Sequence, residues 1–466
     1  MSIRVRACGI RSVFLFAMPA MLACAPDEPG GPLAAGSARQ ASAIERFEIE
    51  GGPKVVIVPV GGVSRVAVQA MYDVGIVDEP RGIAQASHLI EHLACMGATA
   101  KGPAGETFKM LNQIGMANAE TLPSLTHYDY GLPADRFELA IETEAERLRS
   151  LKIDQKLVSD EAAKCYQEVR FVSSRTPPAL GKFALMAATQ AWRHSEKSAR
   201  VLGGLEGVPL SELEAFRARY YHRANLTLIV TGSVSRDRVF EAVKKHFEEL
   251  PSPPFKHPST DWRKVAKQGE IRWDAPATIV YVGFPPPDDP AEQLVMTAAF
   301  QFLEQALSAD PEVQALASGV DSSNMIWPVG RCPGFAAFTL KPGVKPDDAR
   351  AKLTGRLRAA IPGLEAGALA SALPMLAELP WSLEPAALKS QAESMARQMG
   401  SIERAYDALL GNTAIQIGLR ELWLGSERKT MLERAQALAG DGLAGFVKRV
   451  FSEEKRFVTV LVPEKA

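Results

Sequence analysis

The alternation of hydrophobic and polar residues predicts strands and helices in mixed order along the first half of the chain. Period-two or continuous apolar runs indicate strands, and apolar residues three or four positions apart indicate helices. Strands are predicted at Lys54–Pro59, Ser64–Tyr72 and Leu226–Thr231, with an extended stretch at Asn118–Leu132. Helices are predicted between Gly82 and Gly97 and at Arg136–Leu151, Val158–Val172, Leu210–Tyr221 and Arg236–Leu250. This order of elements is typical of the α+β class.

The helix predicted between Gly82 and Gly97 carries two histidines and a glutamate in the pattern H-x-x-E-H. His88 and His92 are four residues apart and share one face of a helix, where both imidazoles can reach one tetrahedral metal ion. Glu91 lies beside them and has a side chain that can act as a general base. The pattern predicts the metal-binding helix of a zinc hydrolase. The alternative is an ordinary amphipathic helix with two partly buried histidines.

Two histidines leave a zinc ion short of one protein ligand, which in a His₂Glu site is a carboxylate from another segment. Spacing alone does not select it. The candidates on the helices that follow are Glu142, Glu144, Glu146, Glu161 and Glu168. Glu161 and Glu168 share a face, but two helical turns separate them by about 10.5 Å, so only one can be an ordinary ligand. Cys95, three residues after His92, is either a fourth ligand or a small buried thiol.

The second half of the chain repeats the order of the first. After the proline-dense segment 251–258, a strand is predicted at Thr278–Phe284 and a helix at Glu292–Leu307. In that helix Gln301-Phe302-Leu303-Glu304-Gln305 takes the place of the H-x-x-E-H run, with a glutamine where each histidine stands. Carboxamides are poor zinc ligands, so this half is predicted to hold no metal. The similarity reflects either a duplication or chance likeness between two amphipathic helices.

Length, charge and cysteine content restrict the class of protein. The 466 residues, 47% of them hydrophobic, are enough for two or three domains with buried cores. The formal net charge of −1 offers no basic surface for nucleic acid, which argues against nucleic-acid binding. Beyond Cys8 and Cys24 only three cysteines remain, too few for a disulfide scaffold.

The first residues have the features of a bacterial export signal. Three arginines among the first eleven residues precede an apolar run, Val13–Leu22, which is too short to span a bilayer. The run ends in a sequence that resembles a lipoprotein box with Cys24 as the acylated residue, and simple secretion is the alternative. Ala25 follows in place of the aspartate of an inner-membrane retention signal, which favours a periplasmic or outer-membrane-anchored protein. Residues 25–43, rich in Gly, Pro, Ala and Ser, indicate a flexible tether.

These motifs together resemble the pitrilysin and insulinase family of zinc peptidases, which carry the histidines and glutamate in this order. The resemblance covers nearly all of the chain after the tether. It is carried by the Gly82–Gly97 frame, by Asn118-Ala119-Glu120-Thr121, similar to the family's N-A-x-T strand, and by Val158–Val169, similar to its glutamate helix. It implies two homologous domains, each a mainly antiparallel sheet packed with helices, that form half of a clamshell. The expected ranges are a signal peptide at 1–24, the tether at 25–43, a zinc-binding peptidase domain at 44–250, a linker at 251–268 and a domain without metal at 269–466.

The resemblance also implies the roles of the site residues. His88, His92 and Glu168 are then the zinc ligands, Glu91 the general base and Glu161 a supporting carboxylate. For Glu161 the alternative is an ordinary solvated carboxylate. Asn118 to Thr121 resembles the edge strand to which these peptidases add an extended substrate through backbone hydrogen bonds, and a plain core strand is the alternative.

The resemblance fails at one point. Active members of the family also present an arginine, followed shortly by a tyrosine, from the second domain or from a partner subunit. Past the linker the only tyrosines are Tyr281 and Tyr406, and neither follows an arginine at the family's spacing. The resemblance therefore implies a metalloendopeptidase for peptides or unfolded segments that forms a heterodimer with a homologous subunit carrying the Arg/Tyr pair. The alternative is a catalytically weak or inactive lipid-anchored scaffold of the same fold.

Overall fold

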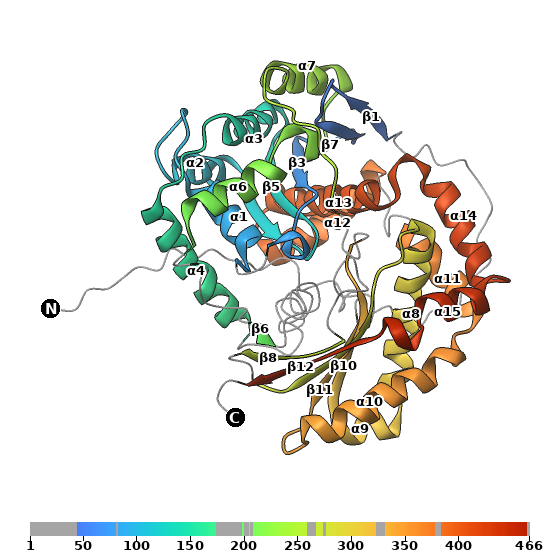
Figure 1. Cartoon of the computed structure of the whole chain (residues 1–466). Helices are drawn as coiled ribbons and strands as arrows, with labels where there is room; N and C mark the ends of the chain where they lie inside the picture. The colour runs from blue at the N-terminus through green and yellow to red at the C-terminus, as the bar shows by residue number, and fades with distance from the viewer. Residues whose placement is uncertain are drawn as a thin grey trace, which may run out of the picture. The chain divides into compact units, whose positions relative to one another are not determined.

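Two six-stranded sheets with helices packed on them form the structure, a computed structural model (Figure 1). It describes residues 44–80, 83–173, 198–199, 205, 208–258, 267–273, 276–322, 331–377 and 384–463. The predicted signal peptide, the tether and Cys24 lie outside the described residues. Among the helices that are described, none combines the length and the hydropathy needed to cross a membrane.

The first sheet contains the strands predicted in the first half of the chain. Its order is β1 (Glu45–Glu48), β2 (Lys54–Pro59), β7 (Leu226–Gly232), β3 (Arg65–Tyr72), β5 (Thr126–Pro133) and β4 (Met116–Thr121). Only β2 and β7 are parallel neighbours, and the other pairs are antiparallel. The extended stretch predicted at Asn118–Leu132 is two strands joined by residues 122–125. β4 therefore lies at one edge of this sheet.

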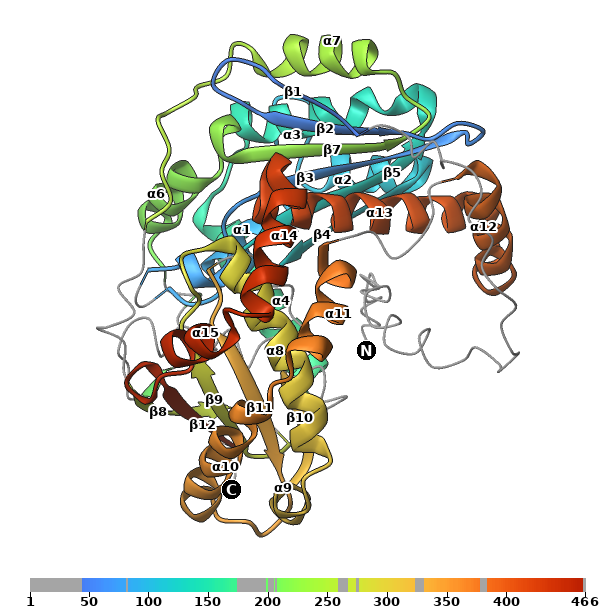
Figure 2. The ribbon, with the colours of Figure 1, turned by 90° about the vertical axis from the view of Figure 1, so that its right-hand side faces the viewer.

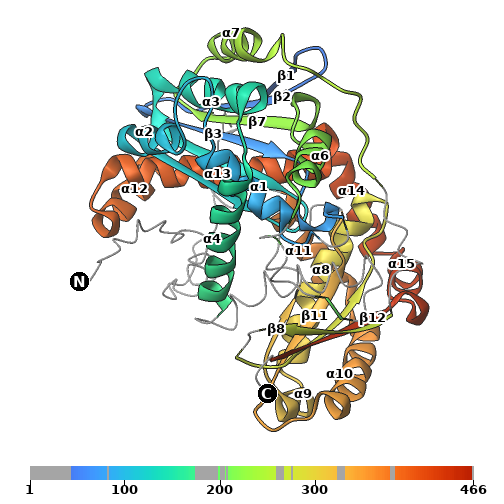
Figure 3. The same ribbon diagram turned by 60° about the vertical axis from the view of Figure 1, so that its left-hand side comes forward.

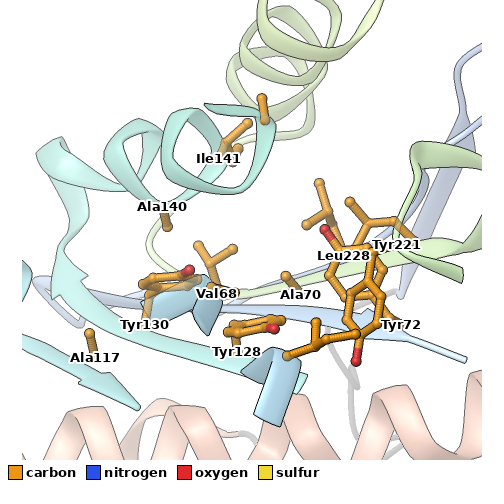
Figure 4. Packing of buried hydrophobic residues seen from close by; sticks show 14 of the residues in the cluster. Val68, Ala70, Tyr72, Ala117, Tyr128, Tyr130, Ala140, Ile141, Tyr221 and Leu228 are labelled. Carbon is orange, nitrogen blue, oxygen red and sulfur yellow. The ribbon is translucent and has the colours of Figure 1, made fainter. Parts of the chain in front are cut away.

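One face of the first sheet packs against helices from the same half of the chain. They are α1 (Ala86–Met96), α2 (Glu106–Ile114), α3 (Glu138–Ser150), α4 (Gln155–Ser173), α6 (Leu210–Tyr220) and α7 (Arg236–Phe247). Alternate residues of β3 and β5, among them Tyr72, Tyr128 and Tyr130, are fully buried on this face. Figure 4 shows Tyr128 and Tyr130 beneath Ala140 and Ile141 of α3. Each large side chain buried in this way stabilises the fold by about 1.5–3 kcal/mol.

The opposite face of the first sheet is covered by a helix from the far end of the sequence. α13 (Ile402–Leu424), preceded by α12 (Pro385–Met399), runs along β3 and β7 (Figure 2). A side chain at Gly418 would meet Met71, so glycine allows the helix to approach closely. Arg65 and Asp407 form a buried ion pair at 2.6 Å across this contact. Segments more than 300 residues apart therefore complete one core.

The second sheet repeats the topology of the first. Its order is β10 (Ala317–Ser322), β11 (Gly334–Leu340), β9 (Ile279–Phe284), β12 (Phe457–Pro463), β8 (Gln268–Trp273) and β6 (Ser198–Ala199). β10, β11, β9 and β12 pair antiparallel in this order, and β12 then pairs with β8 in parallel. The first sheet has the same pattern from β4 to β2, where only the last pair, β7 and β2, is parallel. Its helices are α8 (Pro290–Ser308), α9 (Pro311–Leu316), α10 (Pro346–Ala360), α11 (Ala366–Ala377), α14 (Arg428–Ala439) and α15 (Leu443–Val450). The expected α+β architecture, with two mainly antiparallel sheets packed with helices, is confirmed.

Candidate metal centre

The predicted metal helix, α1, lies side by side with α4 (Figure 3). Leu89, Ile90 and Leu93 of α1 are fully buried in the first core, which fixes the rotation of the helix. His88 and His92 consequently lie at the edge of the core, 5% and 9% exposed, with the polar face of α4 opposite them. The hydrophobic stripe that the sequence predicts for this helix is therefore what positions both imidazoles.

A buried carboxylate holds the beginning of α1. The two carboxylate oxygens of Glu79 accept hydrogen bonds from the backbone N–H groups of Gln85 and Ser87, each at 2.8 Å. Gln85 has a φ of 70°, a left-handed conformation that costs a non-glycine residue about 1–2 kcal/mol. Burial raises the pKa of Glu79 to about 8. Glu79 thus stabilises a strained first turn directly before His88.

The two imidazoles of α1 and one carboxylate of α4 converge. The rings of His88 and His92 lie edge to face, with 4.9 Å between their centroids. Glu168 Oε2 lies 3.4 Å from His92 Nε2 and 3.9 Å from His88 Nε2. Ligand atoms that share a tetrahedral zinc ion, with bonds of about 2.0–2.2 Å, lie about 3.3–3.6 Å apart. The three side chains therefore have nearly the spacing of a His₂Glu site.

The second glutamate of α4 contacts the other nitrogen of His92. Glu161 Oε2 lies 3.2 Å from His92 Nδ1, and Lys164 Nζ donates to Glu161 Oε1 at 2.5 Å. Although burial alone raises the pKa of Glu161, the hydrogen bonds with His92 and Lys164 lower it overall. A carboxylate on Nδ1 selects the tautomer whose Nε2 is free to bind a metal. Burial opposes charge on His92, but its hydrogen bonds with Cys165, Glu161 and Glu168 raise its pKa.

Glu91 connects α1 to the edge strand β4. Thr121, the last residue of β4, donates from Oγ1 to Glu91 Oε2 at 2.7 Å. Asn118, Ala119 and Glu120 precede it on the same strand. Glu120 pairs with His127 of β5, and the two side chains approach to 3.9 Å. The predicted base and the predicted substrate strand are thus neighbours.

The other three candidate glutamates pair with basic side chains away from the histidines. Glu142 pairs with Lys101 at 2.7 Å, and Glu146 pairs with Arg149 at 3.0 Å. Glu144 is buried with Arg147 and the hydroxyl groups of Tyr72 and Tyr130. Of the five candidates, the structure brings Glu161 and Glu168 to the histidines.

Sequence reasoning missed Cys165 and considered Cys95 instead. Cys95 is only half-buried, and its sulfur contacts Arg147 at 3.9 Å. Cys165 is buried on α4, and its Sγ and one ring nitrogen each of His88 and His92 all lie within 4.8 Å of one another. The available signal was its position four residues after Glu161 and three before Glu168, on the face that the two glutamates share.

The doubled fold and the buried imidazole pair place the chain in the class of metallopeptidase-like proteins. Residues 56–202 match the family model Insulinase (Peptidase family M16), and residues 207–342 match Peptidase M16 inactive domain. The chain therefore belongs to peptidase family M16, and the resemblance found in the sequence is confirmed.

Similar proteins include curated relatives and solved structures. The zinc protease PqqE of Helicobacter pylori is 27% identical over 235 residues, which cover 48% of this chain and 52% of that protein. The chain spans about half the length of the curated relatives it matches. A protease from Helicobacter pylori superimposes with a TM-score of 0.60 at 20% identity, covering 91% of this chain and all of that one. The first half of the periplasmic protease PqqL from Escherichia coli superimposes with a TM-score of 0.52 at 17% identity, covering 92% of this chain and 93% of that one. These two structures share the fold.

Proposed function

We propose that the chain is a zinc-dependent metalloendopeptidase that cleaves peptides or unfolded segments together with a homologous partner subunit. The proposal rests on the convergence of His88 and His92 of α1 with Glu168 of α4. Glu91 lies on α1 between the two histidines. Membership of family M16 and the zinc protease named among its relatives support the choice of metal and of reaction.

The residues present fit a zinc ion by their chemistry. Two imidazole nitrogens and one carboxylate oxygen form the His₂Glu set of catalytic zinc sites, and Glu161 on His92 Nδ1 supplies the usual partner of a ligating histidine. When bound, zinc lowers the pKa of a water molecule to about 7 and polarises the carbonyl of a peptide. The catalytic metal is accordingly assigned to His88, His92 and Glu168.

Glu91 is the general base in this proposal. Its carboxylate takes a proton from the attacking water and then delivers it to the amine that leaves. The hydrogen bond from Thr121 restricts the carboxylate to one orientation beside the imidazoles. Because Thr121 ends β4, the same contact places the base at the end of the proposed substrate strand.

In this proposal the substrate binds along the outer edge of β4, the last strand of the first sheet among the described residues. The N–H group of Ala117 donates to the side chain of Asn112 at 3.1 Å, and it therefore points away from β5. Alternation then directs the backbone groups of Ala119 and Thr121 outward as well, whereas those of Asn118 and Glu120 face β5. An extended peptide can pair with Ala119 and Thr121 through backbone hydrogen bonds, which makes recognition depend on peptide conformation more than on side chains.

A partner subunit supplies the groups that this chain lacks. Tyr281 is fully buried in β9, and Tyr406 lies on α13, which packs against the first sheet. Neither residue belongs to the arginine–tyrosine pair of active members of the family. We therefore assign the pair to a homologous subunit. The likeness to one half of PqqL supports an arrangement in which two such units work together.

The protein is exported in this proposal, as a periplasmic or outer-membrane lipoprotein acylated at Cys24. The arginines, the apolar run and the box ending at Cys24 support it, together with the periplasmic location named for PqqL. Metabolic labelling with an alkyne fatty acid should mark the wild-type chain and not the Cys24→Ala variant. An unlabelled wild-type chain would remove the anchor from the proposal.

The proposal is tested with the chain purified alone and with a co-encoded homologue. We expect one zinc ion per chain in both preparations and efficient cleavage of an unstructured peptide library only in the mixture. Full activity of the isolated chain would show that no partner subunit is required. Absence of bound zinc would refute the assignment of the metal site. Bound zinc without cleavage in either preparation would favour the scaffold alternative.

A further inference from the structure

We propose that Cys165 is a fourth protein ligand of the metal bound by His88 and His92, and that its thiolate closes the site in the resting state. This inference rests on the proposed metal binding. It adds a sulfur donor to the two imidazoles and the carboxylate of Glu168.

The geometry brings the sulfur close to one nitrogen of each imidazole. Sγ of Cys165 and a ring nitrogen of each histidine all lie within 4.8 Å of one another. On a shared zinc ion, with Zn–S of about 2.3 Å and Zn–N of about 2.0–2.1 Å, sulfur and nitrogen lie about 3.5 Å apart. A shift of about 1 Å, available from rotation of these side chains, is therefore enough for coordination.

α4 presents its three candidate donors on one face. Glu161, Cys165 and Glu168 follow each other at intervals of four and three residues, so the thiol lies between the two carboxylates. Cys165 is 1% exposed, whereas the side chain of Glu168 is 31% exposed. The thiol therefore approaches the imidazoles from the core, and the carboxylate approaches them from the more accessible part of the site.

The chemistry of a thiol suits this position. Thiolates are strong ligands for zinc and cobalt, and a buried sulfur next to two imidazoles completes a four-ligand set. Formation of the metal–sulfur bond releases the thiol proton to solvent, so the bound ion is neutralised by one thiolate and one carboxylate. The competing role, a small apolar group that fills the first core, predicts no bond to the metal.

A fourth protein ligand changes how the site works. Catalytic zinc sites keep one position open for water, while sites with four protein ligands are closed. With Cys165 bound, a water molecule must displace the sulfur before hydrolysis begins. The thiolate therefore increases the affinity for metal and keeps the resting site closed.

Cobalt titration of the full chain tests the assignment without measuring cleavage. Wild-type protein with one equivalent of Co²⁺ should show visible d–d bands and a near-ultraviolet sulfur-to-cobalt charge-transfer band. Cys165→Ala and Cys165→Ser should keep the d–d bands and lose the charge-transfer band. In both variants the zinc Kd, measured by chelator competition, should rise by at least about tenfold, since even the partners of ligands contribute 10- to 100-fold.

Cys95→Ala is the matched control, because Cys95 lies on α1 near the same site but contacts Arg147. It should leave the charge-transfer band and the zinc Kd unchanged. A wild-type cobalt spectrum with d–d bands but no sulfur band would overturn the role of Cys165 and leave the His₂Glu site standing. Failure of the wild-type chain to bind cobalt or zinc would overturn both proposals.

Discussion

The helices α1 and α8 occupy equivalent places beside the edge strands β4 and β10, yet only α1 carries the histidines. In the first half, Thr121 at the end of β4 donates to Glu91 at 2.7 Å. In the second half, Ser322 at the end of β10 donates to Glu304 at 2.6 Å. The link between the glutamate and a strand hydroxyl thus persists where the histidines do not. It therefore works as a structural connection between helix and strand that does not require the metal.

Among the described residues, α8 has no counterpart of the histidines and α11 has none of Glu168. Gln301 and Gln305 replace the histidines, and both are exposed to solvent. α11 packs on α8 as α4 packs on α1, but its residues, Ala366–Ala377, include no acid and no cysteine. The proposed metal site therefore draws on two cooperating helices, one with imidazoles and one with a carboxylate.

The two helices also begin differently. α8 starts with Asp289, which caps the N–H of Ala291, and with Pro290 in the first turn. α1 starts with left-handed Gln85, whose N–H group donates to the carboxylate of Glu79 six residues earlier. The helix proposed to bind metal thus carries local strain that its counterpart lacks, as is common at functional sites.

Replacing one histidine gives the largest expected difference between the two halves. His92→Ala removes a ligand and the contact with both glutamates of α4, so bound zinc and peptide cleavage should fall below detection. Gln305→Ala at the equivalent position should retain full zinc and full cleavage. Metal analysis after dialysis and a peptide assay with the partner measure both. Stoichiometric zinc in His92→Ala would contradict the assignment of this ligand.

Glu91→Gln separates the base from the metal ligands. Because the amide cannot accept the proton, kcat should fall about 100- to 10,000-fold while zinc remains bound. Glu304→Gln changes the equivalent glutamate of α8 and should leave kcat within experimental error. Equal losses in the two variants, or unchanged cleavage in Glu91→Gln, would refute the role of Glu91.

Glu161→Gln should weaken zinc binding without abolishing it. Loss of the negative charge at His92 Nδ1 should raise the zinc Kd about 10- to 100-fold, as found for partners of ligating histidines. Asp160→Asn, one residue earlier on α4 and exposed, is the control and should leave the Kd unchanged. The same zinc Kd in both variants would show that Glu161 is an ordinary helix carboxylate with no role in metal binding.

Introducing a pair of histidines into α8 should have the smallest effect. Gln301→His combined with Gln305→His recreates the imidazole pair, but α11 offers no carboxylate to complete it. The double variant should therefore bind one zinc equivalent, like the wild type, at concentrations that saturate the first site. Tight binding of a second equivalent would show that two imidazoles suffice in this fold.

The local pattern of hydrophobic and polar residues was sufficient to predict individual strands and helices. β2 has the predicted bounds, Lys54–Pro59, and the helix around His88 forms as its hydrophobic stripe indicates. The break between β4 and β5 was missed, because Leu122 and Leu125 in the connection are buried and continue the apolar pattern. The packing of α13 on the first sheet was also not predictable, since its partners β3, β5 and β7 lie far from it in the sequence.

The site was predictable only in part for a similar reason. The spacing of His88 and His92 indicated a shared face, but helical periodicity left five glutamates open, and only the family resemblance favoured Glu168. Cys165 was missed because a cysteine within a helical apolar pattern is most often a core residue. Choosing a ligand that comes from another helix requires the packing of α4 against α1, which local sequence does not encode.

We assign a zinc ion to His88, His92 and Glu168. The most direct test is an anomalous difference map, recorded at the zinc edge, from crystals of the zinc-loaded chain. We predict one strong peak per chain, about 2.0–2.2 Å from an imidazole nitrogen of each histidine and a carboxylate oxygen of Glu168. A peak elsewhere, or Glu168 turned away from both imidazoles with no other acid in its place, would contradict this assignment of the ligands.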